Sequence, residues 1–152
     1  MKKSVIILIA LIYIASIALV GFFGLKFKIF EEIVYPTGVE LLNDDLVDLR
    51  ESLGLADDAE LLFDYYAYAT KIDGVYKYQL EYKLLPENAT DTTVLFTYDK
   101  EAADKAGTTV DEYGVITFTQ QGALTIQLIP KANGDAPSKR ICIFATDNPP
   151  QN

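Results

Sequence analysis

The residues with the most evident chemical potential are seven carboxylates that lie close together in the chain. They fall within residues 44–60 and are Asp44, Asp45, Asp48, Glu51, Asp57, Asp58 and Glu60. Clustered carboxylate oxygens are the ligands that Ca²⁺ takes in proteins. The cluster lacks the Asp-x-Asp-x-Asp-Gly order of a known calcium loop, and acidic residues near a helix N-terminus or on a solvated helix face explain the same pattern. We therefore expect no metal site here.

The residue types needed for common enzyme chemistry are missing. The sequence contains no histidine and one cysteine, Cys142, so the usual general base, a cysteine metal cluster and an intramolecular disulfide are excluded. Cys142 falls in a predicted terminal strand, where a thiol packs as a small core or edge residue and no nearby base activates it. Neither a glycine-rich phosphate loop nor a nucleophile elbow is present. We predict a protein that is not an enzyme and uses no cofactor.

Tyrosine is abundant enough to form a recognition surface, with ten residues in the chain. Exposed tyrosine is common at protein interfaces and at surfaces that bind sugars. Neighbouring residues of a strand point to opposite faces, so Tyr65 and Tyr66 cannot share one buried face. Cross-strand packing accounts for most of the other tyrosines, and the absence of Trp disfavours a carbohydrate ligand. The residues predicted to form a candidate binding surface are Tyr65, Tyr66, Tyr68 and Tyr113.

Charge is distributed unevenly along the chain. All 22 acidic residues lie at or after Glu31, and nine of the 13 basic residues follow it, so the part after residue 30 carries a net charge of −13. Such a surface repels nucleic acid and anionic lipid headgroups. We expect no nucleic-acid partner.

The first thirty residues predict a membrane span. Residues 4–25 contain no charged side chain, and a helix of that length, at about 1.5 Å per residue, crosses the roughly 30 Å hydrocarbon core. Lys2 and Lys3 favour a cytoplasmic N-terminus, which predicts an uncleaved signal anchor over residues 1–30 and an extracellular C-terminal domain. The alternative is a signal peptide cleaved near Ala18, although the apolar run continues beyond that site.

Beyond the span, alternation of apolar and polar residues predicts a mainly β domain over residues 31–147, followed by a flexible tail at 148–152. The predicted strands cover residues 39–42, 63–72, 75–85, 92–98, 108–111, 115–119, 123–129 and 139–146. Their spacing, and turn dipeptides such as Asp73-Gly74, predict an antiparallel β-sandwich.

A short helical insertion interrupts this pattern between Asn43 and Glu60. Three leucines with helical spacing lie on one face: Leu46, Leu49 and Leu53. Asn43 or Asp44 is the predicted N-cap and Gly54 the predicted C-cap.

Three motifs follow one another between Tyr78 and Thr146. They are Leu85-Pro86-Glu87-Asn88-Ala89-Thr90, Thr109-Val110-Asp111-Glu112-Tyr113-Gly114-Val115-Ile116-Thr117 and Gly122-Ala123-Leu124-Thr125-Ile126. In order and spacing they resemble the bacterial immunoglobulin-like (Ig-like) domain of group 2, although Phe96 stands where that family usually has Trp. The resemblance implies an Ig-like sandwich that serves as an adhesive or spacer module at bacterial surfaces, sometimes contacting carbohydrate or host protein. It brings no catalytic residues.

Together these observations predict a single-pass, membrane-anchored cell-surface module that binds or supports other molecules without catalysis. Only about ten residues join the span to the domain, which favours neighbouring envelope or surface proteins as partners, with carbohydrate as a further class. Two alternatives stay open: an accessory single-pass subunit of a secretion, pilus or transport complex, and a secreted Ig-like protein released by cleavage near Ala18.

Overall fold

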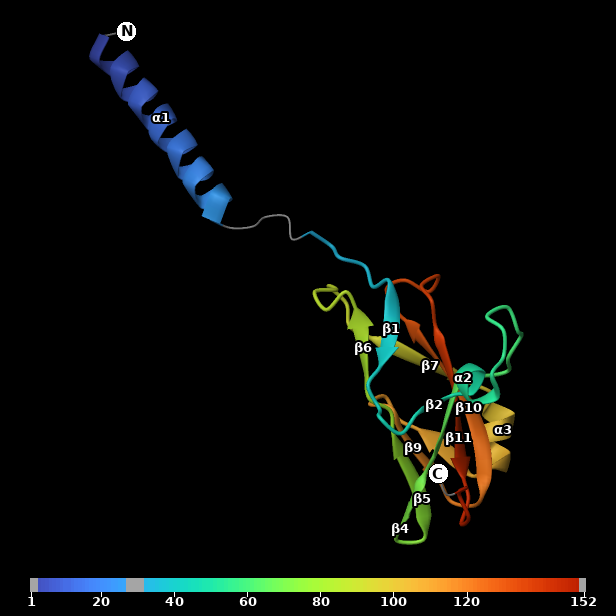
Figure 1. Cartoon of the computed structure of the whole chain (residues 1–152). Coiled ribbons are helices and arrows are strands. Elements are labelled where there is room, and N and C mark those ends of the chain that lie inside the picture. Colours follow the sequence, from blue (N-terminus) through green and yellow to red (C-terminus); the bar gives the residue numbers. More distant parts are fainter. Residues whose placement is uncertain (1–2, 27–31, 151–152) are drawn as a thin grey trace. The chain divides into compact units, whose positions relative to one another are not determined.

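The computed structural model describes residues 3–26 and 32–150, and the chain divides into two compact units, residues 1–33 and 34–152. The described part of the first unit contains one helix, α1 (Lys3–Lys26) (Figure 1). The stretch Lys3–Phe22 has a mean hydropathy of 2.9, and none of it is buried. The predicted apolar helix is thus present and is long enough to cross a membrane, a test that a signal sequence would also pass.

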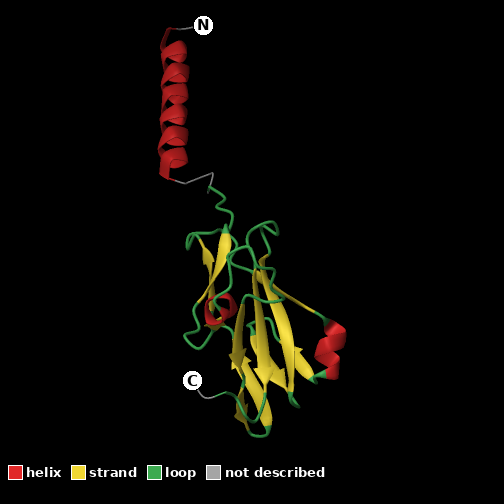
Figure 2. Ribbon diagram, turned by 45° about the vertical axis from the view of Figure 1, so that its right-hand side comes forward, coloured by secondary structure: helices red, strands yellow, loops and turns green. Residues whose placement is uncertain are grey.

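The second unit is mainly β, as the alternation predicts, with two short helices, α2 (Leu49–Leu53) and α3 (Lys100–Lys105) (Figure 2). Its strands are, in chain order, β1 (Gly38–Leu41), β2 (Val47–Asp48), β3 (Tyr65–Tyr68), β4 (Thr70–Ile72), β5 (Val75–Gln79), β6 (Tyr82–Leu85), β7 (Val94–Tyr98), β8 (Thr108–Val110), β9 (Val115–Phe118), β10 (Gly122–Pro130) and β11 (Lys139–Ala145).

Hydrogen bonds join these strands into several sheets. One sheet has five strands in the order β2-β3-β11-β10-β7, a second has four in the order β4-β5-β9-β8, and β1 pairs with β6. The long pairing of β10 with β11 is antiparallel and runs from Gly122 opposite Ala145 to Leu128 opposite Lys139. The hairpin predicted at Asp73-Gly74 joins β4 to β5, and both turn residues have positive φ, 51° and 85°, as a tight two-residue turn requires.

Side chains from both larger sheets meet in one hydrophobic core. Its buried members from these sheets and the segment after β5 include Tyr76, Tyr78, Leu80, Ile116, Phe118, Leu124, Ile126, Leu128, Ile141 and Ile143. Val39 of β1 and Leu84 of β6 extend the same core. The alternation in residues 123–129 correctly predicts that Leu124, Ile126 and Leu128 point inward. Full burial of each such side chain contributes about 1.5–3 kcal/mol.

Three features of the β prediction need correction. β3 pairs with β11 in parallel, so the five-stranded sheet is not purely antiparallel. The predicted strand 63–72 is two strands, β3 and β4, which lie in different sheets. The predicted strand 75–85 is also divided, because β5 belongs to the four-stranded sheet and β6 pairs with β1. Alternation reports which way a side chain points, and it carries no information on which sheet receives each half of a strand.

The helical insertion is shorter than predicted, and Asp48 is its N-cap, not Asn43 or Asp44. The Asp48 carboxylate accepts hydrogen bonds from the backbone N–H groups of Arg50 and Glu51 at 2.8 and 3.1 Å. Gly54 is the C-cap, as predicted, with φ 61°. Asn43 instead bonds the backbone of Gln79 and Glu81 with its side-chain amide. Asn43, which local rules would assign to the cap, thus has a tertiary role instead.

Phe118 is fully buried, so its replacement tests this core. We expect Phe118→Ala to lower the free energy of unfolding by about 3–5 kcal/mol, because a large cavity replaces the ring. The measurement is urea unfolding of the full chain in detergent, followed by circular dichroism. Lys77→Gln, on the exposed side of β5, is the matched control and should change stability by less than about 0.5 kcal/mol. Equal effects of the two substitutions would contradict the assigned core.

Candidate recognition surface

Four aromatic side chains form one group on the outer face of the five-stranded sheet. They are Phe63, Tyr66, Tyr68 and Phe144, and we call them the outer aromatic patch. Phe144 contacts the other three rings, with centroid distances of 6.3 Å to Phe63, 6.2 Å to Tyr66 and 5.7 Å to Tyr68. Tyr66 and Tyr68 meet edge to face at 6.0 Å. Each ring pair of this kind contributes roughly 0.5–1.5 kcal/mol to stability beyond the burial of apolar area. The contacts among the four rings therefore stabilise their arrangement.

The register of two strands places these rings together. In β11, Ile141 and Ile143 point into the core and are 0% exposed, so the alternate residues Cys142 and Phe144 face outward. The parallel strand β3 sets Tyr66 opposite Cys142 and Tyr68 opposite Phe144. The patch is therefore a direct product of the parallel β3–β11 pair.

The two tyrosine hydroxyls of the patch have no hydrogen-bond partner among the described residues, in contrast to those of Tyr76 and Tyr78. The latter two donate to Asp147 and Asp45, each at 2.8 Å. Partial burial, together with the neighbouring Tyr66 and Cys142 groups, raises the pKa of Tyr68. Its hydroxyl therefore stays protonated at neutral pH and can both donate and accept.

Small side chains lie directly beside the rings on β10. Ala123 is opposite Phe144 and Thr125 is opposite Cys142, and both are exposed. We call these two residues the shelf. Because neither side chain reaches the height of an aromatic ring, the side of the patch that faces β10 is open to solvent.

An ion pair between Arg140 and Asp64 lies at one end of this face. Arg140 Nη2 lies 2.9 Å from Asp64 Oδ1, and Arg140 Nη1 donates to the Leu61 carbonyl at 2.7 Å. Partial burial raises the pKa of Asp64, but the hydrogen bonds and charge of Arg140 outweigh this effect and hold it below the usual carboxyl value. The two charges neutralise each other. Apart from Arg140, the outward residues of β3, β11 and β10 around the patch, such as Gln127, are uncharged.

The structure brings together two of the four predicted surface residues, Tyr66 and Tyr68. Tyr65 faces the other way, as alternation requires, and packs against the core with Lys139 Nζ 5.4 Å from its ring centroid. Tyr113 is 72% exposed, but it lies in the turn between β8 and β9, which belong to the four-stranded sheet. Phe144 was not predicted, although its alternation with Ile143 was a signal that could have identified it.

Two of the acidic residues within 44–60 take individual structural roles. Asp48 caps α2 and Asp45 accepts the hydrogen bond of Tyr78. Across residues 3–26 and 32–150, no group of three or more His, Cys, Asp or Glu is arranged to hold a metal ion.

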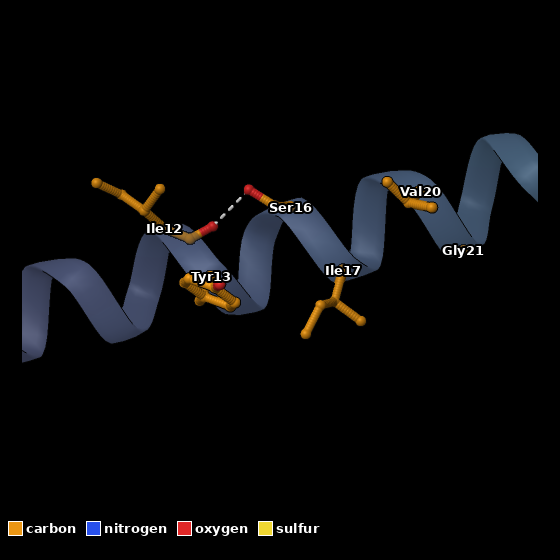
Figure 3. Close-up of a pocket in the computed structure, with 6 residues that line it drawn as sticks. All are labelled: Ile12, Tyr13, Ser16, Ile17, Val20 and Gly21. Atoms are coloured by element: carbon orange, nitrogen blue, oxygen red, sulfur yellow. Dashed lines mark hydrogen bonds between the residues drawn. The ribbon is translucent and has the colours of Figure 1, made fainter.

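A shallow hollow runs along the surface of α1 and is lined by Ile12, Tyr13, Ser16, Ile17, Val20 and Gly21 (Figure 3). Ser16 Oγ donates to the Ile12 carbonyl one turn earlier at 2.8 Å, which satisfies its hydroxyl within the helix. All the lining residues belong to one helix, so the hollow is surface relief where small side chains lie between large ones. Lipid chains would fill it in a bilayer, and it is no candidate ligand site.

Comparison with known proteins adds no family to this description. No protein-family model matches the chain, and no curated protein sequence matches it. Its function must be inferred from its own residues.

Cys142 lies under the patch and is 5% exposed. Burial raises the pKa of its thiol, and a hydrogen bond with Thr125 only partly opposes that effect. We expect the folded chain to react with Ellman's reagent at pH 8 at least ~100-fold more slowly than the urea-unfolded chain, because the thiolate is the reactive form. The control is the Cys142→Ser/Thr125→Cys double variant, whose thiol on the exposed shelf should react fast while folded. Fast reaction of native Cys142 would contradict its burial beneath the patch.

The Arg140–Asp64 pair predicts a defined pH dependence. The pKa of Asp64 is lower in the folded chain than in the unfolded one, so its stabilising contribution is complete above about pH 4 and disappears as the pH falls through the folded value. We expect Asp64→Asn to lower the urea midpoint at pH 7, and the difference from the unmodified chain to shrink below pH 4. Asp104→Asn, at an exposed position of α3, should have little effect at either pH. A difference that stays constant with pH would contradict the ion pair.

Proposed function

We propose that the protein is a single-pass, membrane-anchored cell-surface module, without catalytic activity, that displays an Ig-like β-sandwich for binding. The observation that carries this proposal is an uncharged aromatic face on a domain whose net charge is strongly negative. That domain follows a helix apolar enough to span a bilayer. The neutral face would meet the partner, and the acidic remainder would keep the domain soluble and away from anionic surfaces.

The length of the apolar segment supports an uncleaved anchor. α1 has 24 residues, which at 1.5 Å each gives about 36 Å, more than the roughly 30 Å hydrocarbon core needs. The apolar residues that follow Ala18 belong to the same helix, so cleavage there would leave an apolar mature end. Lys2 and Lys3 favour a cytoplasmic N-terminus, which supports a position of the β unit outside the cell.

The local structure of the β8–β9 hairpin supports the proposed Ig-like fold. Asp111 Oδ1 accepts hydrogen bonds from the backbone of Tyr113 and Val115 at 2.9 and 2.8 Å, which closes the turn between β8 and β9. Gly114 has φ 81°, and a Cβ there would lie 3.2 Å from the Phe96 ring. Glycine is therefore required both by conformation and by the close approach of that ring, which stands where the resembled family has Trp.

The first motif of the resemblance holds the beginning of the β unit. Val34 N donates to Thr90 Oγ1, and Thr90 N donates to the Val34 carbonyl, both at 2.9 Å. Thr37 N donates to the Leu85 carbonyl at 2.6 Å. In a displayed module these bonds would fasten the domain at the point where the connector from the membrane enters it.

Fractionation of cells that express the full chain with a C-terminal tag tests the proposal. We expect the full-length chain in the membrane fraction, resistant to carbonate extraction, with its C-terminal domain digested by protease added to spheroplasts. Ala18→Leu is the matched control, because it removes a small residue that signal peptidase requires. Both forms should migrate identically. A soluble product that begins after Ala18, and that Ala18→Leu abolishes, would establish the secreted alternative instead.

A further inference from the structure

We infer that the outer aromatic patch and its shelf bind a neutral carbohydrate chain. This inference rests on the proposed function, a domain displayed for binding, and names the class of its ligand. The residues concerned are those of the patch, Phe63, Tyr66, Tyr68 and Phe144, with Ala123 and Thr125 of the shelf.

The chemistry of the patch matches the two-sided chemistry of a sugar ring. One face of a hexose carries C–H groups that stack on an aromatic ring, while its rim carries hydroxyls that need donors and acceptors. Although the chain has no Trp, the absence of which disfavours a carbohydrate ligand, Tyr66 and Tyr68 supply both features, since their rings are part of the patch and their hydroxyls have no partner within the described chain. The low shelf beside them leaves room for a ring to lie against the patch.

The rings are already held in place before any ligand arrives. Tyr66 and Tyr68 both contact Phe144, at 6.2 and 5.7 Å between centroids, and both are partly buried. Ordering a side chain on binding costs affinity, so rings that are fixed in the free protein bind more tightly than mobile ones. The rings are tilted against one another, Tyr68 and Phe144 by 31° and the other pairs by 76–88°, so this arrangement favours a ligand that stacks on one fixed ring at a time.

The charge on this face selects a neutral ligand. Asp64 and Arg140, the charged residues at its end, neutralise each other, and the other outward residues of β3, β10 and β11 are uncharged. The domain as a whole is strongly acidic, so an anionic polysaccharide or a nucleic acid would be repelled before it reached the patch. A neutral chain meets no such barrier.

The size of the face favours an oligosaccharide over a protein. The patch and its shelf extend over three of the five strands, about 4.8 Å apart, and over four residues of about 3.3 Å along each, which gives roughly 200 Å². A stable protein interface needs about 800 Å² from each partner, several times more. Two copies of the chain would also bring two acidic domains together. A few sugar rings cover the available area.

Ligand-observed saturation-transfer NMR on the full-length protein in detergent tests the inference. The probes are neutral hexasaccharides of β-1,4-glucose, α-1,4-glucose, β-1,4-mannose and β-1,4-N-acetylglucosamine, with hexagalacturonate as an anionic comparison. We expect at least one neutral probe to bind saturably with a Kd below about 1 mM, and hexagalacturonate not to bind.

Variants connect binding to the patch. Tyr66→Ala should weaken binding at least ~10-fold, and Tyr66→Phe, which keeps the ring, should weaken it only a few-fold. Tyr113→Ala, an exposed tyrosine outside the patch, is the matched control and should leave the Kd unchanged. Circular dichroism and the urea midpoint establish that each variant is folded.

The inference is overturned if none of the four neutral probes binds at 5 mM in this assay, or if folded Tyr66→Ala binds as well as the unmodified chain. It is equally overturned if sedimentation shows a dimer that Tyr66→Ala dissolves, because a second copy would then occupy the patch. If carbohydrate binding fails but fractionation retains the full-length chain in membranes, the proposed membrane-anchored module still stands. Loss of α1 by cleavage, in turn, would remove the anchor without affecting binding by the purified protein.

Discussion

The antiparallel pairing of β10 with β11 is the constraint on which both faces of the larger sheet depend. Its register, from Gly122–Ala145 to Leu128–Lys139, sends Ile141 and Ile143 into the core and Phe144 to the outer face. A slip of one residue would exchange these sets, exposing two isoleucines and burying the ring that contacts the rest of the patch. The β10–β11 register therefore determines both the stability of the core and the arrangement of the recognition surface. A change of register would change both.

The Arg140–Asp64 pair extends that constraint to the segment that precedes β3. Arg140 belongs to β11, and it bonds both the Asp64 carboxylate and the Leu61 carbonyl. These bonds hold residues 61–64, which join the helical insertion to β3, against the sheet, where Phe63 contacts Phe144. The insertion has no counterpart in the resembled family's motifs, and the segment that follows it contributes a ring, Phe63, to the patch.

The sequence predicts the features that depend on local rules. The Asp73-Gly74 hairpin, the Gly54 C-cap and the inward residues of 123–129 all follow from turn geometry or alternation. Features that depend on distant segments were missed: the parallel β3–β11 pair, the division of residues 75–85 between sheets, and the bonds of Asn43 to Gln79 and Glu81, which leave the cap to Asp48. For the same reason the sequence predicts two residues of the patch, Tyr66 and Tyr68, and misses the two phenylalanines. Alternation identifies Tyr66 and Tyr68 as outward candidates, but only the parallel register shows that Phe144 lies beside them.

The central place of β11 has a consequence for the order in which the domain can fold. The five-stranded sheet has the order β2-β3-β11-β10-β7, so its middle strand is also the last strand of the chain. Until residues 139–145 are available, no strand joins β3 to β10, and one side of the core stays uncovered. Contacts between segments so distant in sequence also form slowly. A domain exported as an unfolded chain would benefit from this arrangement, because stable structure that could block the translocation channel waits until residues 139–145 have emerged.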